Sequence, residues 1–157
     1  MPNEAVTEDI VRERLAELGY FDPAAEIVVE RQQSAIAAVK RLLRQASKTG
    51  GSGVGYPDFI ITSPKNPDYV IVVECKASRA RHQSSTGDRI AEFAVDGALH
   101  YASFLSKEYN TIALGVSGES LDELLVSTFV HVRGAMASTE LKSPTGAELD
   151  HLIPFSD

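Results

Sequence analysis

The 157-residue sequence has a single cysteine and no long apolar run. One cysteine, Cys75, forms neither an internal disulfide nor a cysteine-based zinc cluster, which agrees with a reducing compartment. No apolar run approaches the length of a membrane span, and the amino end lacks the basic start of a secretion signal. We therefore expect a cytoplasmic protein without a membrane partner.

The sequence also lacks an overall positive charge, since its formal net charge is −7. Nucleic-acid binding usually requires a basic surface, so this charge argues against a general nucleic-acid coat protein. The distribution is uneven: residues 1–30 carry eight acidic and two basic side chains, residues 31–117 seven and eleven, and residues 118–157 seven and two. The middle segment is therefore the part suited to phosphate, and firm affinity for DNA would need another domain.

The strongest pattern in the sequence is a pair of apolar, β-branched runs at residues 59–62 and 69–76. A turn rich in Pro, Asn and Asp separates them, which is typical of an antiparallel hairpin. A hairpin sets the start of its first strand beside the end of its second. Asp58, Glu74 and Lys76 are therefore predicted to meet at one end of a sheet.

Two carboxylates and an ammonium in one place indicate a cation site. Mg²⁺ prefers oxygen ligands and is commonly held by one or two carboxylates with waters and substrate phosphate. Asp58 and Glu74 are the predicted metal-binding side chains, while Cys75 faces the other side of the strand and offers its backbone carbonyl. The simpler alternative is a solvated strand end with Lys76 as a salt-bridge partner. Charges that interrupt such an apolar run are more often functional or paired.

The residues Pro57-Asp58, followed after an apolar strand by Glu74-Cys75-Lys76, resemble the PD-(D/E)xK nuclease signature. The wider run through residues 46–61, 73–77 and 98–102 resembles the nuclease domain at the amino end of restriction-modification proteins. These are type II enzymes fused to an adenine DNA methyltransferase, or type I restriction subunits. The resemblance implies an α/β fold with a restriction-endonuclease-like core, in which helices flank a mixed central β-sheet in the order αβββαβ.

The resemblance also implies an activity, a Mg²⁺-dependent endonuclease with Mn²⁺ as a substitute, which cuts double-stranded DNA to 5′-phosphate and 3′-hydroxyl ends. Asp58, Glu74 and Lys76 would be catalytic, with Lys76 orienting or deprotonating the attacking water. The implied partners are a fused or separate methyltransferase or translocase domain and a transient homodimer for double-strand cleavage. Two alternatives stay open: a catalytically silent DNA-binding or interaction module of this fold, and a metal-dependent phosphohydrolase acting on a small substrate.

Helical periodicity predicts three helices, at about residues 7–18, 34–46 and 89–102. Apolar runs predict two further strands, at residues 111–116 and 125–132. Thr7 is the predicted N-cap of the first helix, and residues 26–30 fit either a strand or the approach to a helix. We expect one nuclease domain over residues 1–157, of which about 142–157 forms a linker to other domains.

The first predicted helix carries acids that are candidates to join the site. The resemblance favours Glu8, since related nucleases often place a metal-positioning acid about a dozen residues before a Gly-aromatic pair such as Gly19-Tyr20. Glu13, on a different face of the helix, is the alternative. An acid in a first helical turn is otherwise a capping charge.

Supporting residues and DNA contacts are predicted around the motif. Gly55 is expected to allow a tight turn or a close backbone approach to the scissile phosphate, and Pro57 precedes the catalytic aspartate. Tyr101 occupies the tyrosine position of the Gln-x-x-x-Tyr helix motif of some related nucleases, but Gly97 stands where the glutamine would be. The predicted DNA contacts are basic residues beside the motif: Lys48, Arg79, Arg81, His82 and Arg89.

The segment that precedes the hairpin is basic and then glycine-rich. Five bases and no acid lie between Arg31 and Lys48. This run fits a solvated helix face and a surface facing a DNA backbone equally well. The glycine-rich stretch lacks the Gly-Lys-Ser/Thr ending and the preceding strand of a nucleotide-binding P-loop, so we exclude that motif.

Overall fold

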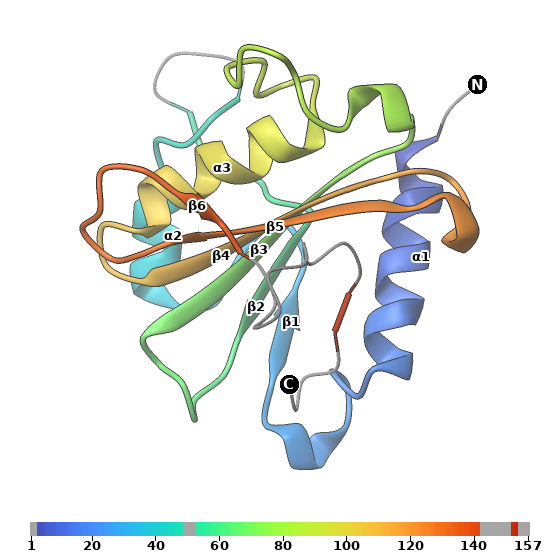
Figure 1. Ribbon diagram of the computed structural model, residues 1–157. Helices are drawn as coiled ribbons and strands as arrows, with labels where there is room; N and C mark the ends of the chain where they lie inside the picture. The colour runs from blue at the N-terminus through green and yellow to red at the C-terminus, as the bar shows by residue number, and fades with distance from the viewer. Residues whose placement is uncertain (1–2, 49–52, 142–151, 154–157) are drawn as a thin grey trace.

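The computed structural model describes residues 3–48, 53–141 and 152–153. Within them a mixed sheet of six strands runs through the middle of the molecule, with helices on both faces (Figure 1). The strands lie side by side in chain order, as β1 (Val28–Glu30), β2 (Phe59–Thr62), β3 (Tyr69–Lys76), β4 (Asn110–Ser117), β5 (Leu125–His131) and β6 (Thr139–Glu140). The predicted fold class is confirmed, because this arrangement is consistent with a restriction-endonuclease-like core.

Strands β2 and β3 form the predicted antiparallel hairpin, with Phe59 opposite Val73. Strand β3 then pairs in parallel with β4 along its whole length, so that Lys76 lies opposite Ser117. A parallel pair needs a crossover connection, and α3 (Ala94–Leu105) provides it. The other neighbouring strands are antiparallel. The C-terminal ends of β3 and β4 therefore lie side by side, at the end of the sheet that carries Glu74 and Lys76.

Each face of the sheet has its own apolar core, because side chains alternate along a strand. The core beneath α1 (Glu4–Glu17) includes Val11, Leu15, Phe59, Val73 and Cys75. The core beneath α2 (Ala37–Leu43) and α3 includes Val39, Leu43, Ile60, Val72 and Tyr101. Figure 1 shows α1 on one side of the sheet and α2 and α3 on the other. The residues at the end of β3 can therefore be reached from helices on both faces.

The first helix begins earlier than the sequence predicts. Its N-cap is Asn3, whose side chain accepts a hydrogen bond from the Ala5 N–H at 3.0 Å, so the assignment of Thr7 as N-cap is wrong. Thr7 is fully buried inside α1, where its hydroxyl donates to the Gly118 carbonyl at 2.6 Å. A buried threonine that bonds the loop after β4 anchors the first turns of α1 to the end of the sheet where β3 and β4 finish.

The other two helices are shorter than predicted. Before α2, Glu30 holds the chain in a turn, since its carboxylate accepts hydrogen bonds from the Ser34 hydroxyl and the Ala35 N–H, each at 2.6 Å. Helix α3 begins at Ala94 rather than near Arg89, because the buried Asp96 accepts a hydrogen bond from the Arg89 N–H at 2.9 Å. Side-chain bonds to the backbone compete with helix formation at both places.

Little of the predicted linker at 142–157 belongs to the described residues, which include only Leu152 and Ile153 of it. Leu152 is buried in the core beneath α1, and the Tyr20 hydroxyl donates to the Ile153 carbonyl at 3.1 Å. The remainder of that predicted linker lies outside the described residues. In the described ranges, no helix has both the length and the apolar character needed to cross a membrane.

Candidate active site

Asp58 and Glu74 are tied to one another across the hairpin. The Asp58 N–H donates to Glu74 Oε1 at 3.2 Å, and the Cys75 N–H donates to Asp58 Oδ2 at 2.7 Å. This follows from the register, which places Phe59 opposite Val73 and so sets residue 58 beside residue 74. Each carboxylate is therefore oriented by a backbone N–H of the neighbouring strand segment.

Both carboxyl groups are buried, with Asp58 7% and Glu74 1% exposed. Burial raises the pKa of Asp58 to about 9, and the adjacent Glu74 carboxylate adds to that rise. Burial also raises the pKa of Glu74, against the opposing influence of the Lys48 ammonium. Two like charges held together in a poorly solvated place are unfavourable unless a cation joins them.

Two lysines lie next to the carboxylate pair. Lys48 forms an ion pair with Glu74 Oε2, and its Nζ lies 5.6 Å from the centre of the Tyr101 ring. Lys76 Nζ lies 3.4 Å from Glu4 Oε2 in the first turn of α1. The sequence predicts Lys48 only as a DNA contact, whereas the structure makes it the direct partner of Glu74.

Glu8 approaches the pair from α1, on the other face of the sheet. Its carboxyl group forms a hydrogen bond with Asp58, and its Oε1 lies 3.4 Å from the Arg31 guanidinium. Glu13 is exposed. Of the two acids that the sequence leaves open, the structure therefore brings Glu8 to Asp58.

The donor set of the site fits a hard divalent cation. Its available donors are carboxylate oxygens, because the Cys75 side chain is fully buried and burial raises the pKa of its thiol well above the usual value. Among the described residues, no three His, Cys, Asp or Glu side chains are grouped as a metal-binding set. A cation held by Asp58 and Glu74 would fill its other positions with water and phosphate oxygens, as is common for Mg²⁺.

Helix α3 forms a close wall behind Glu74. A Cβ atom at Gly97 would lie 3.2 Å from Glu74 Oε2 and 2.9 Å from the Ile90 carbonyl oxygen. Tyr101, one turn further on, is 1% exposed and forms a hydrogen bond with the Tyr56 backbone, and its burial raises the pKa of its hydroxyl. Helix α3 thus offers no amide to the site at position 97, and Lys48 contacts Glu74 Oε2 instead.

The segment that leads into β2 also depends on a close approach. The Gly55 N–H donates to the Leu43 carbonyl at 2.8 Å. A Cβ atom on Gly55 would lie 2.6 Å from both the Ala46 carbonyl oxygen and Tyr101 Cε1, so no side chain fits there. Pro57 is buried. These contacts dock the segment onto the end of α2 and position Asp58 at the start of β2.

His82, in the loop after β3, is held inside the fold. Its two ring nitrogens each lie 2.8 Å from a serine hydroxyl, Ser117 at the end of β4 and Ser127 in β5. Burial lowers the pKa of His82, and Arg79 adds to that effect. A neutral ring with both nitrogens engaged joins the loop to the sheet and is poorly placed to contact DNA.

The arginines of the same loop are exposed. Arg81 and Arg89 both form ion pairs with Glu92, and their guanidinium groups lie 5.6 and 5.0 Å from the centre of the Phe93 ring. Arg79 has no ion-pair partner in the described part of the chain. Arg79 is therefore the cation of this loop that costs least to redirect to a phosphate.

Two of these contacts have no local signal in the sequence. Lys48 and Glu74 are 26 residues apart, and Glu4 and Lys76 are 72 residues apart. Contacts at such separations depend on how the helices pack on the sheet. Gly97 did carry a signal, because a glycine inside a helical pattern commonly marks a packing or functional constraint.

Comparison with known proteins finds a restriction-modification relative. Over 98% of its length, the chain is 31% identical to the Type II restriction enzyme and methyltransferase RM.BcgI of Heyndrickxia coagulans. The chain spans 24% of the length of that protein. No family model and no solved structure matches the chain. The similarity supports a relationship with restriction-modification proteins.

We expect the metal-free chain to lose stability as the pH rises from about 4 to about 9. Folding raises the pKa values of Asp58 and Glu74. The contribution of such groups to the free energy of unfolding is complete below the unfolded pKa, which is 3.8 for Asp58. For Asp58 it is lost as the pH approaches the folded value of about 9. Mg²⁺ binds the ionised form, so it should raise the Tm more at high pH than at low pH.

Thermal unfolding across this pH range, with EDTA or Mg²⁺, tests the expectation. Asp58→Asn should flatten the pH dependence, while Asp68→Asn, at an exposed position of the β2–β3 turn, should not. Equal slopes for the wild type and Asp58→Asn would show that the buried pair does not control the stability.

Proposed function

We propose that this chain is a Mg²⁺-dependent DNA endonuclease domain of a restriction-modification enzyme, which hydrolyses phosphodiester bonds to 5′-phosphate and 3′-hydroxyl ends. The observation that carries the proposal is the buried, hydrogen-bonded pair Asp58 and Glu74, with Lys76 two residues beyond on β3. The similarity to RM.BcgI, named as a restriction enzyme and methyltransferase, supports the restriction-modification setting.

Phosphodiester hydrolysis has to bring water to an anionic phosphorus and stabilise a more negative transition state. When bound, Mg²⁺ supplies Lewis acidity toward a phosphate oxygen and lowers the pKa of its water. Asp58 and Glu74 hold the cation, and the backbone N–H groups that bond them keep both carboxylates oriented. The Lys76 ammonium orients the water and places positive charge beside the developing oxyanion.

The other ionic groups set the charge of the site. Lys48 neutralises Glu74 before a cation binds, and Glu4 holds the Lys76 ammonium at the end of β3. Glu8 adds an acidic oxygen next to Asp58. We propose that Glu8 and the Cys75 carbonyl complete the cation's surroundings, and that Lys76 exchanges Glu4 for the substrate.

DNA is the substrate that the surrounding charges favour. The exposed arginines of the loop after β3 suit an extended polyanion. The net charge of −7 makes the chain a weak DNA binder by itself. We propose that further affinity comes from a fused or separate methyltransferase or translocase domain, and that two copies meet transiently to cut both strands.

Incubation with supercoiled plasmid tests the function. We expect nicked and then linear DNA with Mg²⁺ or Mn²⁺ and intact plasmid after addition of EDTA. Retained Mg²⁺ binding without cleavage would instead identify a silent module of this fold. Hydrolysis of bis(p-nitrophenyl) phosphate with no effect on plasmid would identify a phosphohydrolase for small substrates.

A further inference from the structure

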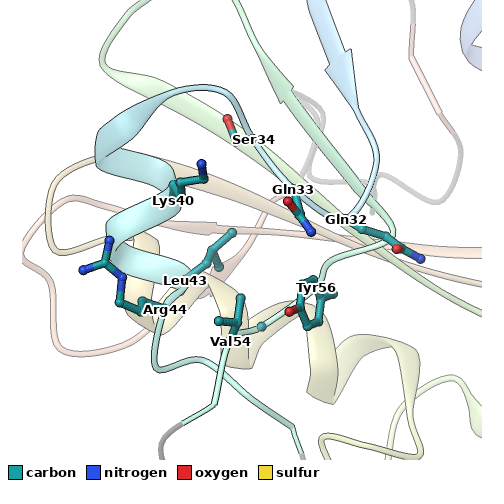
Figure 2. Close-up of a pocket in the computed structure, with 9 residues that line it drawn as sticks. Gln32, Gln33, Ser34, Lys40, Leu43, Arg44, Val54 and Tyr56 are labelled. Carbon is teal, nitrogen blue, oxygen red and sulfur yellow. The ribbon is translucent and has the colours of Figure 1, made fainter.

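A cavity of about 300 Å³ lies next to the candidate active site, on the face of the sheet covered by α2. Figure 2 shows it between α2, the turn after β1 and the segment that leads into β2. Tyr56, which lines it, is two residues from Asp58. Its volume is at the lower end of the range for small-ligand pockets. The proposed mechanism uses none of the side chains that line this cavity.

The rim of the cavity is positively charged. Lys40 lies in α2 and Arg44 directly follows that helix, and their spacing of four residues corresponds to about one helical turn. In the described residues neither has an acidic partner, whereas Arg41 of the same helix is paired with Glu108. No acidic side chain of the described residues lines the cavity. The rim is therefore suited to an anionic group such as a phosphate.

Two amide side chains, Gln32 and Gln33, form the opposite wall (Figure 2). Gln32 has a positive φ of 67°, which is unusual for a residue with a side chain and is found at functional sites more often than elsewhere. The Gln33 N–H donates to the Arg31 carbonyl at 2.7 Å, and Glu30 holds the residues that follow. The backbone of the turn is held in place, and it presents two exposed amides, each a donor and an acceptor for the edge of a nucleobase.

The remaining lining is apolar and aromatic. Leu43 and Val54 also line the cavity, and Tyr56 is 49% exposed. A half-exposed aromatic ring next to apolar side chains is a platform on which a base can stack. The cations suit the phosphate of a nucleotide, the amides suit the edge of its base, and the ring suits the face of that base.

We propose that this cavity binds one nucleotide, with its phosphate at Lys40 and Arg44, its base edge at Gln32 and Gln33, and its base stacked on Tyr56. That this nucleotide belongs to a DNA strand, near the phosphate that is cut, rests on the proposed nuclease function. A free mononucleotide offers the same chemistry. The two sources are separated by experiment.

Heteronuclear NMR of the 157-residue chain, in EDTA, tests this inference with three probes: deoxyadenosine monophosphate, the tetranucleotide d(AAAA) and inorganic phosphate. The side-chain amide signals of Gln32 and Gln33 and the ring signals of Tyr56 should shift saturably with the nucleotides. Tetranucleotide binding tighter than that of the mononucleotide identifies a strand as the source, and tighter binding of the mononucleotide identifies a free nucleotide. Shifts of equal size with phosphate, or no shift of the amide signals, would overturn the proposal.

Variants in the same experiment separate stacking from charge. Tyr56→Ala should weaken nucleotide binding about tenfold, and the Lys40→Ala, Arg44→Ala double variant by a similar factor. The matched controls lie at the far end of the hairpin, where Tyr69 is 47% exposed and Lys65 is also exposed. Tyr69→Ala and Lys65→Ala should leave the affinity unchanged, and equal losses in the control and cavity variants would refute the site.

This outcome is independent of the nuclease test. Saturable shifts at Gln32 and Gln33 in a chain that cuts no plasmid would retain the cavity and reject the nuclease function. Plasmid cleavage without such shifts would retain the nuclease function and reject the cavity.

Discussion

Replacing Asp58 with asparagine is expected to lower the rate of plasmid cleavage by at least about a thousandfold, because the cation loses one of its two protein carboxylates. A loss of several kcal/mol of transition-state stabilisation corresponds to this factor, since about 1.4 kcal/mol is tenfold in rate. Asparagine has the size of aspartate, and its side-chain oxygen can still accept the Cys75 N–H.

The same substitution should not harm the fold. It removes a buried carboxyl group whose pKa is raised to about 9, so the metal-free variant should be at least as stable as the wild type at neutral pH. Cleavage rates, thermal unfolding and Mg²⁺-induced Tm shifts are the measurements, with Asp68→Asn as the charge-matched control.

Lys76→Met should reduce cleavage as well, but should keep the Mg²⁺-induced shift. Wild-type cleavage by either Asp58→Asn or Lys76→Met would remove the basis of the proposed mechanism.

Replacing Lys48 with methionine is expected to destabilise the metal-free chain by about 3 kcal/mol, because removal of one partner leaves a buried charge uncompensated. Glu74 is 1% exposed, and the Lys48 side chain is 19% exposed in the ion pair. For a domain of this size the loss corresponds to a Tm decrease of roughly 10 °C. Mg²⁺ should restore part of the stability, since a cation at Asp58 and Glu74 replaces the missing positive charge.

Urea unfolding at pH 8, with EDTA or Mg²⁺, measures the effect. Arg41→Met is the matched control, because Arg41 and its partner Glu108 are 55% and 42% exposed and should contribute less than about 1 kcal/mol. The double variant Lys48→Met, Glu74→Gln should recover much of the loss, since it also removes the unpaired carboxylate. Equal effects of Lys48→Met and Arg41→Met would show that the buried ion pair has no special weight.

The similarity to RM.BcgI and the charge distribution both lead us to expect that another domain holds the DNA. The chain matches about a quarter of a protein that is named for both restriction and methylation. Its acidic net charge is unfavourable for binding DNA alone, while Arg79 beside the site and Lys40 and Arg44 at the cavity have no ion-pair partner in the described part of the chain. A DNA-holding domain elsewhere in an enzyme would supply the affinity that these few cations do not.

The hairpin and the proximity of Asp58 and Glu74 could be predicted from the sequence, because the patterns that specify them are local. Two apolar, β-branched runs give the strands, the Pro- and Asn-rich turn gives their pairing, and the resulting register places Asp58 beside Glu74. Apolar runs also predicted the helix that is α3 and the strand that is β4, whereas the parallel pairing of β3 with β4 is known only from the structure. Helix ends were less predictable, since Asn3 and Thr7 are both good N-caps and the outcome depends on the Gly118 carbonyl, which binds Thr7.

Sequence alone thus determined the α/β class, the two carboxylates and the lysine that follows them. Only the tertiary structure decided which further side chains reach that pair, namely Lys48 from beyond α2 and Glu8 from α1. It also decided that α3 packs against Glu74 at Gly97. It also decided that Lys40 and Arg44 border a cavity with Gln32 and Gln33. The physical reason is that these contacts join residues far apart in the chain, so they exist only after α1 has packed on one face of the sheet and α2 and α3 on the other.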